Sequence, residues 1–172
     1  MKKLLLTGSF ILFGSLAHAV DGYKNFKFEM SPIEVQKLAN IELTRTDQGN
    51  GIILYQGENF PFAGENVDIA FFFIENKLLR IGFEIPIDKA LPTIEALTEK
   101  YGKPFSQSDQ ATFEAVDNIP NSEAFMGFDK DTIFVKIMSD EKNKQTSIVI
   151  YTSPKYEQLM LKNQKEKIKD DL

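Results

Sequence analysis

The sequence contains no cysteine, no tryptophan and one histidine, His18. The absence of cysteine excludes disulfides, thiolate metal sites and catalysis by a Cys-His pair. His18 lies in a predicted leader, so the mature chain would also lack the imidazole needed for Ser-His-Asp catalysis and for histidine-ligated metals. Carboxylate chemistry, Ser-Lys chemistry and metals bound by oxygen ligands remain.

The candidate residues for that chemistry are scattered over turns. Asp129 and Asp131 fall in one predicted turn, and Asp140 and Glu141 fall in another. Neither pair has the ligand spacing of a calcium loop. The Ser-x-x-Lys pattern at 139–142 lies in a polar turn. We therefore expect no catalytic residue, no bound metal and no cofactor, and we predict that the protein is not an enzyme.

The first nineteen residues have the pattern of a secretory leader. A basic start (Met1-Lys2-Lys3) precedes an apolar run at 4–16 and the small-x-small site Ala17-His18-Ala19. The run is shorter than the roughly 20 residues of a membrane-spanning helix, and no lipoprotein cysteine follows it. These features predict a signal peptide over 1–19, cut after Ala19. The mature protein would be periplasmic or secreted, without a membrane span.

The mature chain of 153 residues (172 minus 19) is long enough for a single domain with a substantial core. Residues 20–154 carry 13 basic and 21 acidic side chains, a net charge of −8. Nucleic acids are bound through a basic face, so this balance excludes a nucleic-acid partner. We expect the partner to be another envelope or secreted protein.

The strongest structural signal is a hairpin at 67–85, with its turn at 75–77. Side chains alternate between the two faces of a strand, so each arm presents one apolar face. The predicted inner face consists of Val67, Ile69, Phe71, Phe73, Leu79, Ile81, Phe83 and Ile85. Phe72 and Ile74 lie on the opposite face, where no predicted element clearly covers them. We expect Phe72 either to be buried by the C-terminal tail or to form part of an interaction surface.

A helix is predicted at 31–40, because Ser31 and Glu34 form a capping box. A second is predicted at 88–102, where apolar residues recur with a period of 3.6 residues. A third is predicted over the charged tail at 154–172. Further strands are predicted at 25–29, 42–57 (a hairpin), 112–116, 124–128, 132–138 and 147–152. Residues 105–111 are expected to form a loop. The predicted class is α+β: an antiparallel β-sheet built from two helix-plus-strands halves, with helices packed on one face and a C-terminal helical tail. The domain is expected to span 20–153, with halves at about 25–86 and 87–153.

Residues 57–66 are predicted to form a loop that carries Phe60 and Phe62 on either side of Pro61. Two aromatic side chains on a loop indicate a patch for a partner. The alternative is that both fold back onto the sheet. Together with Phe72, they are the candidate partner contacts.

The segments Phe28–Val35 and Phe73–Leu78 resemble motifs of small bacterial envelope modules of the SmpA/OmlA type, which are similar to tandem modules of the β-lactamase-inhibitor-protein-like fold. Glu29 stands where those modules usually have glycine. The stretches 101–104, 148–151 and 169–172 resemble a group of uncharacterised secreted bacterial proteins. The resemblance implies the fold and an envelope location, and it implies no activity.

Three functions are compatible with the sequence. The first is a non-enzymatic periplasmic binding or interaction module. The second is a secreted inhibitor or immunity protein that blocks a hydrolase, because an acidic body would suit a basic target. The third, ranked well behind, is an enzyme of carboxylate type.

Overall fold

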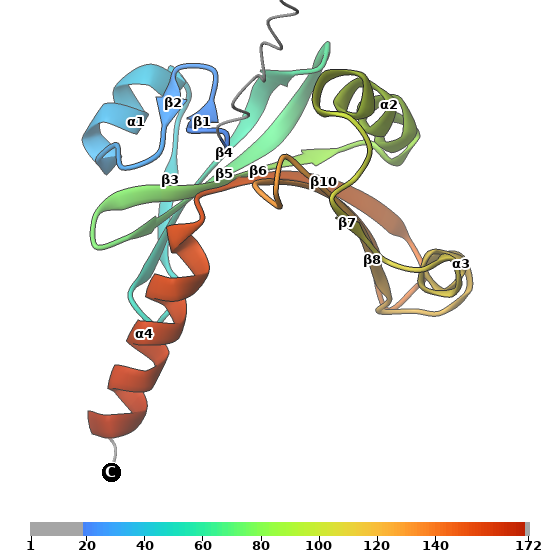
Figure 1. Cartoon of the computed structure of the whole chain (residues 1–172). Helices are drawn as coiled ribbons and strands as arrows, with labels where there is room; N and C mark the ends of the chain where they lie inside the picture. The colour runs from blue at the N-terminus through green and yellow to red at the C-terminus, as the bar shows by residue number, and fades with distance from the viewer. Residues whose placement is uncertain (1–18, 171–172) are drawn as a thin grey trace, which may run out of the picture.

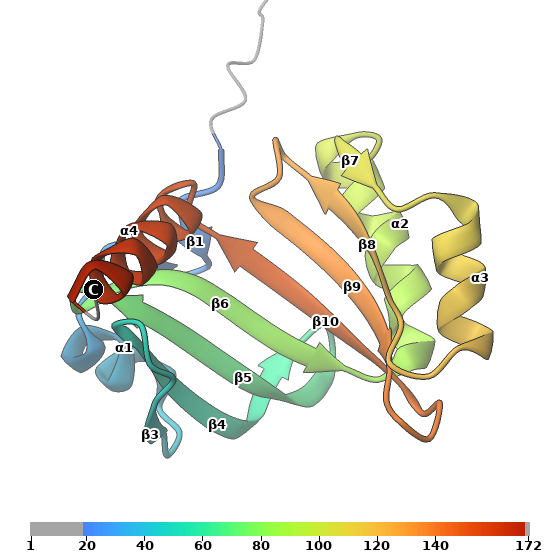
Figure 2. The ribbon, with the colours of Figure 1, turned by 90° about the horizontal axis from the view of Figure 1, so that it is seen from below.

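One antiparallel sheet of eight strands runs through both halves of the chain, in the order β3-β4-β5-β6-β10-β9-β8-β7 (Figures 1 and 2). The computed structural model describes residues 19–170, so most of the predicted leader lies outside the described residues. The first half forms β3 (Thr44–Asp47), β4 (Ile52–Phe62), β5 (Glu65–Ile74) and β6 (Lys77–Ile85). The second half forms β7 (Ser106–Gln107), β8 (Glu123–Phe128), β9 (Ile133–Ser139) and β10 (Gln145–Thr152). The final strands of the two halves, β6 and β10, pair at the centre.

Helices lie on both sides of this sheet. α1 (Pro32–Ala39) and α2 (Ala90–Tyr101) lie over one face, which we call the covered face, whereas α4 (Lys155–Asp170) lies below the other (Figure 1). A short hairpin, β1 (Gly22–Tyr23) and β2 (Phe26–Lys27), also packs over the covered face. A 3₁₀ turn, η1 (Ile87–Lys89), precedes α2, and α3 (Gln110–Asn118) packs against β8 and β9. The expectation of helices on one face holds for α1 and α2, and the predicted C-terminal helical tail is confirmed as α4, which lies on the opposite face. Within 19–170 no helix has the length and apolar character needed to cross a membrane.

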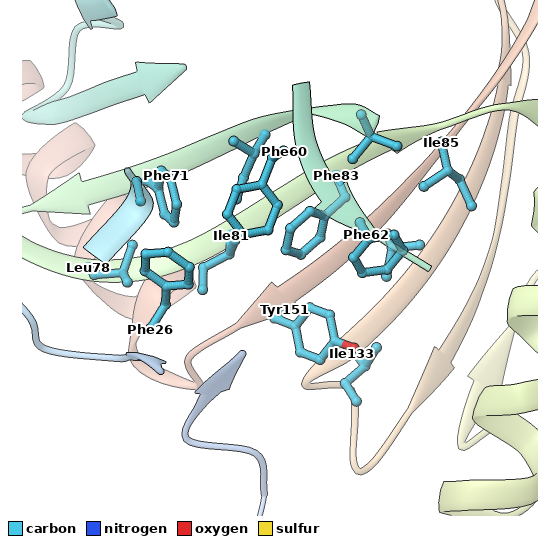
Figure 3. Packing of buried hydrophobic residues seen from close by; sticks show 14 of the residues in the cluster. Phe26, Phe60, Phe62, Phe71, Leu78, Ile81, Phe83, Ile85, Ile133 and Tyr151 are labelled. Atoms are coloured by element: carbon cyan, nitrogen blue, oxygen red, sulfur yellow. The ribbon is translucent and has the colours of Figure 1, made fainter. Parts of the chain in front are cut away.

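The core lies on the covered face and is rich in phenylalanine (Figure 3). Phe83, two residues before the end of β6, is fully buried. Its ring centroid lies 4.3 Å from that of Phe62 and 4.7 Å from that of Tyr23. Because the chain has no cysteine, this apolar burial holds the domain together without a covalent crosslink.

The prediction for the inner face of β6 was wrong at one position. Phe72 pairs with Arg80 but Phe73 pairs with Leu78, so Leu79 is an extra residue in β6, a β-bulge. Leu78 therefore points into the core, and Leu79 packs on the opposite face against Tyr156. The extra residue reverses the alternation on one side of the bulge, and this is why the period-two pattern placed Leu79 inside.

The predicted strand at 112–116 is also wrong, because these residues lie in α3. Asp109 is the N-cap of this helix, and its carboxylate accepts a hydrogen bond from the backbone N–H of Thr112 at 2.8 Å. Val116 is the buried residue of the helix. The adjoining stretch, expected to be a loop, contains the two-residue strand β7, which pairs with β8.

Residues 57–66 do not form a loop. β4 continues to Phe62, a turn at Ala63-Gly64 follows, and β5 begins at Glu65. A register irregularity between Gly57 and Phe60 interrupts the pairing of β4 with β5. Beyond it Phe60 pairs with Val67, whose side chain lies in the core. The Pro61 that suggested a loop lies within this strand pair.

The predicted capping box at the start of α1 is confirmed: the Glu34 N–H donates to Ser31 Oγ, and the Ser31 N–H donates to Glu34 Oε2 at 2.8 Å. We expect Ser31→Ala to lower the free energy of unfolding by about 1 kcal/mol, because the first turn loses a hydrogen-bond acceptor. Urea denaturation measures this change. Gln36→Ala, at an exposed position within the same helix, is the control and should change stability by less than about 0.5 kcal/mol. Equal effects of the two variants would contradict a stabilising cap.

Candidate functional site

The face of the sheet opposite the core is hollowed between β4 and β10. Figure 2 shows α4 across one end of this face and the middle of β5, β6 and β10 in open view. The hollow, which we call the open groove, has a volume of about 980 Å³. It is lined by Ile41, Glu42, Thr44, Gln56, Gly57, Glu58, Asn59, Asp68, Ile69, Ala70, Phe72, Arg80, Gly82, Glu84, Ile148 and Ile150. This volume is in the range of natural ligand sites.

Small residues create the hollow. Ala70 pairs with Gly82, and Gly82 pairs with Ile150 on the neighbouring strand. A Cβ placed on Gly82 would meet its nearest neighbours only at 3.8–4.0 Å, at ordinary contact distance. Larger apolar side chains surround Ala70 and Gly82 and remain partly exposed: Phe72, Ile148 and Ile150. The floor of the groove is therefore an apolar surface that no segment within 19–170 fully covers.

One end of the groove is acidic. Asp68 and Glu84 face each other directly across β5 and β6, and Glu42 and Glu58 line the same hollow. All four side chains are exposed, and none joins an ion pair found within residues 19–170. Like charges directly opposite each other destabilise an antiparallel pair. The groove therefore presents negative charge that a bound cation would neutralise.

The other end is closed by the first turns of α4. The guanidinium carbon of Arg80 lies 3.7 Å from the centre of the Tyr156 ring, and Arg80 Nε donates to Thr152 Oγ1 at 3.2 Å. Arg80 Nη2 also lies 3.5 Å from a carboxylate oxygen of Glu157. Burial lowers the pKa of Arg80 from its ordinary value and raises that of the Tyr156 phenol. Arg80 is already paired with Glu157 and stacked on Tyr156. Its positive charge therefore does not neutralise the four carboxylates at the other end of the groove.

The structure places the three sequence-predicted contacts differently. Phe60 and Phe62 are only 7% and 6% exposed and belong to the core beside Phe83. They offer no surface to a partner. The alternative expectation, that both pack onto the sheet, is the one that the structure shows. Phe72 is only partly covered by the C-terminal helix, and its role as a partner contact stays a prediction. Its ring contacts that of Tyr156 in α4, with centroids 6.4 Å apart, and its remaining surface lines the open groove.

Sequence reasoning missed the residues at the centre of the groove. Ala70 and Gly82 carry no chemical group that marks a site, and each becomes informative only through its cross-strand neighbours. Asp68 and Glu84 gave a usable signal, because both lie on the outer face of the predicted hairpin. Finding the pair required the register of β5 against β6.

The turn carboxylates Asp131 and Asp140 accept structural hydrogen bonds, Asp140 within its own turn and Asp131 from β7. Asp140 Oδ1 accepts backbone N–H groups from Lys142 and Lys144 at 2.8 Å each. Asp131 Oδ1 accepts from the Ser106 hydroxyl at 2.5 Å. Over residues 19–170, no three His, Cys, Asp or Glu side chains are grouped as metal ligands.

An uncharacterised protein of Haemophilus influenzae is 30% identical over 174 residues, which cover 100% of this chain and 99% of that protein. No solved structure matches the chain. A family model described as "Uncharacterised protein" matches residues 23–171, and the chain therefore belongs to that family.

Proposed function

We propose that the chain is a non-enzymatic binding module, exported to the periplasm or secreted, that docks a segment of another envelope or secreted protein in the open groove. The observation that carries this proposal is the hollow of about 980 Å³ on the sheet face that the core does not use. Its apolar floor and unpaired carboxylates are complementary to a protein segment of mixed apolar and basic character. The resemblance of 28–35 and 73–78 to envelope modules of the SmpA/OmlA and β-lactamase-inhibitor-protein-like type supports the same role.

The groove specifies the chemistry of its occupant. Ala70 and Gly82 leave space for apolar side chains between Phe72 and Ile150. The facing carboxylates of Asp68 and Glu84 suit a lysine or arginine, because an opposite charge removes their mutual repulsion. The proposed occupant of the groove is therefore an extended segment that carries apolar side chains and at least one basic side chain.

Inhibition of a secreted hydrolase is the second candidate function. The acidic end of the groove supports it, because exposed carboxylates attract a basic surface and speed association with it. The two functions use the same groove and differ in the partner, which is an envelope protein in the first case and a hydrolase that loses activity in the second.

Site-specific crosslinking in cells tests the groove. A photo-crosslinking amino acid replaces Ala70, which lines the groove, and in a matched variant it replaces Ala96, an exposed residue of α2. We expect ultraviolet light to give a discrete covalent adduct from position 70 and none from position 96. Mass spectrometry of the adduct then decides between an envelope protein and a hydrolase. Absence of the adduct at 70, or the same adduct at both positions, would rule out docking in this groove.

The acidic pair is tested by Glu84→Lys. Opposite Asp68, the new lysine replaces a repulsive pair by an attractive one, so the free protein should gain about 0.2–1 kcal/mol of stability. The same change should weaken binding of a peptide with alternating lysine and valine at least tenfold, measured by fluorescence anisotropy. A peptide with glutamate in place of lysine should not bind the wild-type protein.

Glu99→Lys, at an exposed position of α2, is the matched charge control. It changes the net charge equally but leaves the groove intact, so affinity for the lysine-valine peptide should stay within about twofold of wild type. Equal losses in the Glu84 and Glu99 variants would show that overall charge, rather than the groove, determines binding.

A further inference from the structure

The start of the predicted mature chain makes a specific polar contact with a distant turn. The backbone nitrogen of Val20 donates to Oδ2 of Asp129 at 2.7 Å, although the two residues are 109 positions apart. The Val20 side chain is partly buried and packs against the core cluster. Asp129 begins the turn between β8 and β9. The first residue after the predicted cleavage site therefore has a defined place in the fold.

The Asp129 carboxylate is held in position by its own turn. The Thr132 hydroxyl lies 2.9 Å from the same Oδ2 atom, and Thr132 is only 2% exposed. The Thr132 carbonyl accepts the backbone N–H of Thr152 at 2.8 Å, which ties the turn to the end of β10. The acceptor that faces Val20 is thus held by Thr132 within its turn, and Thr132 in turn is hydrogen-bonded to the end of β10.

We propose that cleavage after Ala19 converts this contact into an ion pair between the α-ammonium group of Val20 and the carboxylate of Asp129. Hydrolysis of the Ala19–Val20 amide consumes one water molecule. Ala19 leaves with a carboxylate, and the nitrogen of Val20 becomes an amine that takes up a proton. The neutral N–H donor is replaced by a positively charged group with three N–H donors. A charge-assisted hydrogen bond of this kind is roughly twice as strong as a neutral one.

This ion pair locks the N-terminal hairpin over the centre of the molecule. Tyr23 lies three residues after Val20. Its ring packs on Tyr151 of β10 and on Phe83 of β6, at centroid distances of 5.1 Å and 4.7 Å. These two rings belong to the strands at which the halves meet. Leader removal therefore strengthens the contact between the start of the first half and the second half. The processed chain gains an ion pair where the precursor has a neutral hydrogen bond. This inference rests on the proposed export and leader cleavage, and it does not depend on what the open groove binds.

The first test identifies the N-terminus. The full chain is expressed with its own leader in a bacterial host, and the protein from the periplasm is examined by intact mass and N-terminal sequencing. We expect a single species that begins at Val20. A different first residue would overturn the proposal, because the ammonium group would no longer lie at Asp129.

The second test is a double-mutant cycle on purified protein. Asp129→Asn is compared in a chain that begins at Val20 and in a chain in which Gly-Ser precedes Val20. Removal of the carboxylate should lower the melting temperature by about 3 °C or more in the first chain, since about 1 kcal/mol corresponds to 2–4 °C at this size. In the extended chain the change should be less than about 1 °C. The difference should shrink in 1 M salt, where charges are screened.

Glu141→Gln, an exposed acidic residue in another turn, is the control and should behave alike in both chains. An equal loss from Asp129→Asn in both chains would show that Asp129 only caps its own turn, and would overturn the ion pair.

Discussion

Phe83→Ala is expected to lower the free energy of unfolding by about 3–5 kcal/mol, the range found when a buried aromatic side chain is truncated. Phe83 is fully buried two residues before the end of β6. Its ring contacts those of Tyr23, Phe60, Phe62 and Tyr151, at centroid distances of 4.7, 5.9, 4.3 and 6.1 Å. These rings come from three different strands, β1, β4 and β10, so they cannot all move inward to fill the space. Natural domains have only about 5–15 kcal/mol of stability in total, and the variant should unfold at a much lower urea concentration.

Two further variants separate the position from the residue type. Phe105 is 68% exposed, so Phe105→Ala should change stability by less than about 0.5 kcal/mol. Phe83→Leu keeps much of the side-chain volume and should cost clearly less than Phe83→Ala. If Phe105→Ala were as damaging as Phe83→Ala, the stability of the domain would not depend on this cluster.

Local patterns predicted the parts of the fold that local chemistry determines. The capping box at Ser31 and Glu34 placed the start of α1 correctly, because both partners lie within one helical turn. The alternation from Val67 to Phe73 identified the inner face of β5, which is buried as expected. In both cases all the interacting groups lie within a few residues of each other.

Predictions failed where one residue changes the geometry or where partners are distant. The bulge at Leu79 changes which side chains of β6 point into the core. Both Leu78 and Leu79 are apolar, so the alternation of apolar residues alone could not reveal it. The segment at 112–116 is too short for its periodicity to distinguish a strand from a helix, and the N-cap at Asp109 was the signal that was missed. The pairing of Gly82 with Ile150, which shapes the open groove, depends on β6 and β10 meeting at the centre of the sheet.

The packing of α4 against the sheet could be predicted only in part, because its partners in the sheet are distant in sequence. The apolar residues of this helix are sparse, and Leu161 and Ile168 are indeed exposed. Tyr156, however, is 4% exposed and packs with Leu79 and Ile74, both fully buried. Leu79 faces this helix only because of the bulge. A change in register within the central hairpin therefore creates the docking site for the C-terminal helix.

Tyr156→Ala is expected to release α4 from the sheet and to lower the free energy of unfolding by about 3 kcal/mol. The variant removes the buried ring that covers Leu79 and Ile74, and it leaves the Arg80 guanidinium without the aromatic face on which it stacks at 3.7 Å. Urea denaturation measures the stability, and hydrogen exchange at the amides of α4 measures the release of the helix. Exchange there should become much faster than in β6, whose hydrogen bonds do not depend on the helix.

Two controls define what the Tyr156 ring contributes. Tyr156→Phe keeps the ring over Leu79 and beside Arg80, so it should cost less than about 1.5 kcal/mol and leave exchange in α4 slow. Leu161→Ala alters an exposed residue of the same helix and should have little effect. If Tyr156→Ala were no worse than Leu161→Ala, the helix would be held by contacts other than the Tyr156 ring. Because Phe72 touches Tyr156 at the edge of the open groove, faster exchange in α4 with unchanged peptide binding would further show that the helix borders the groove without forming its floor.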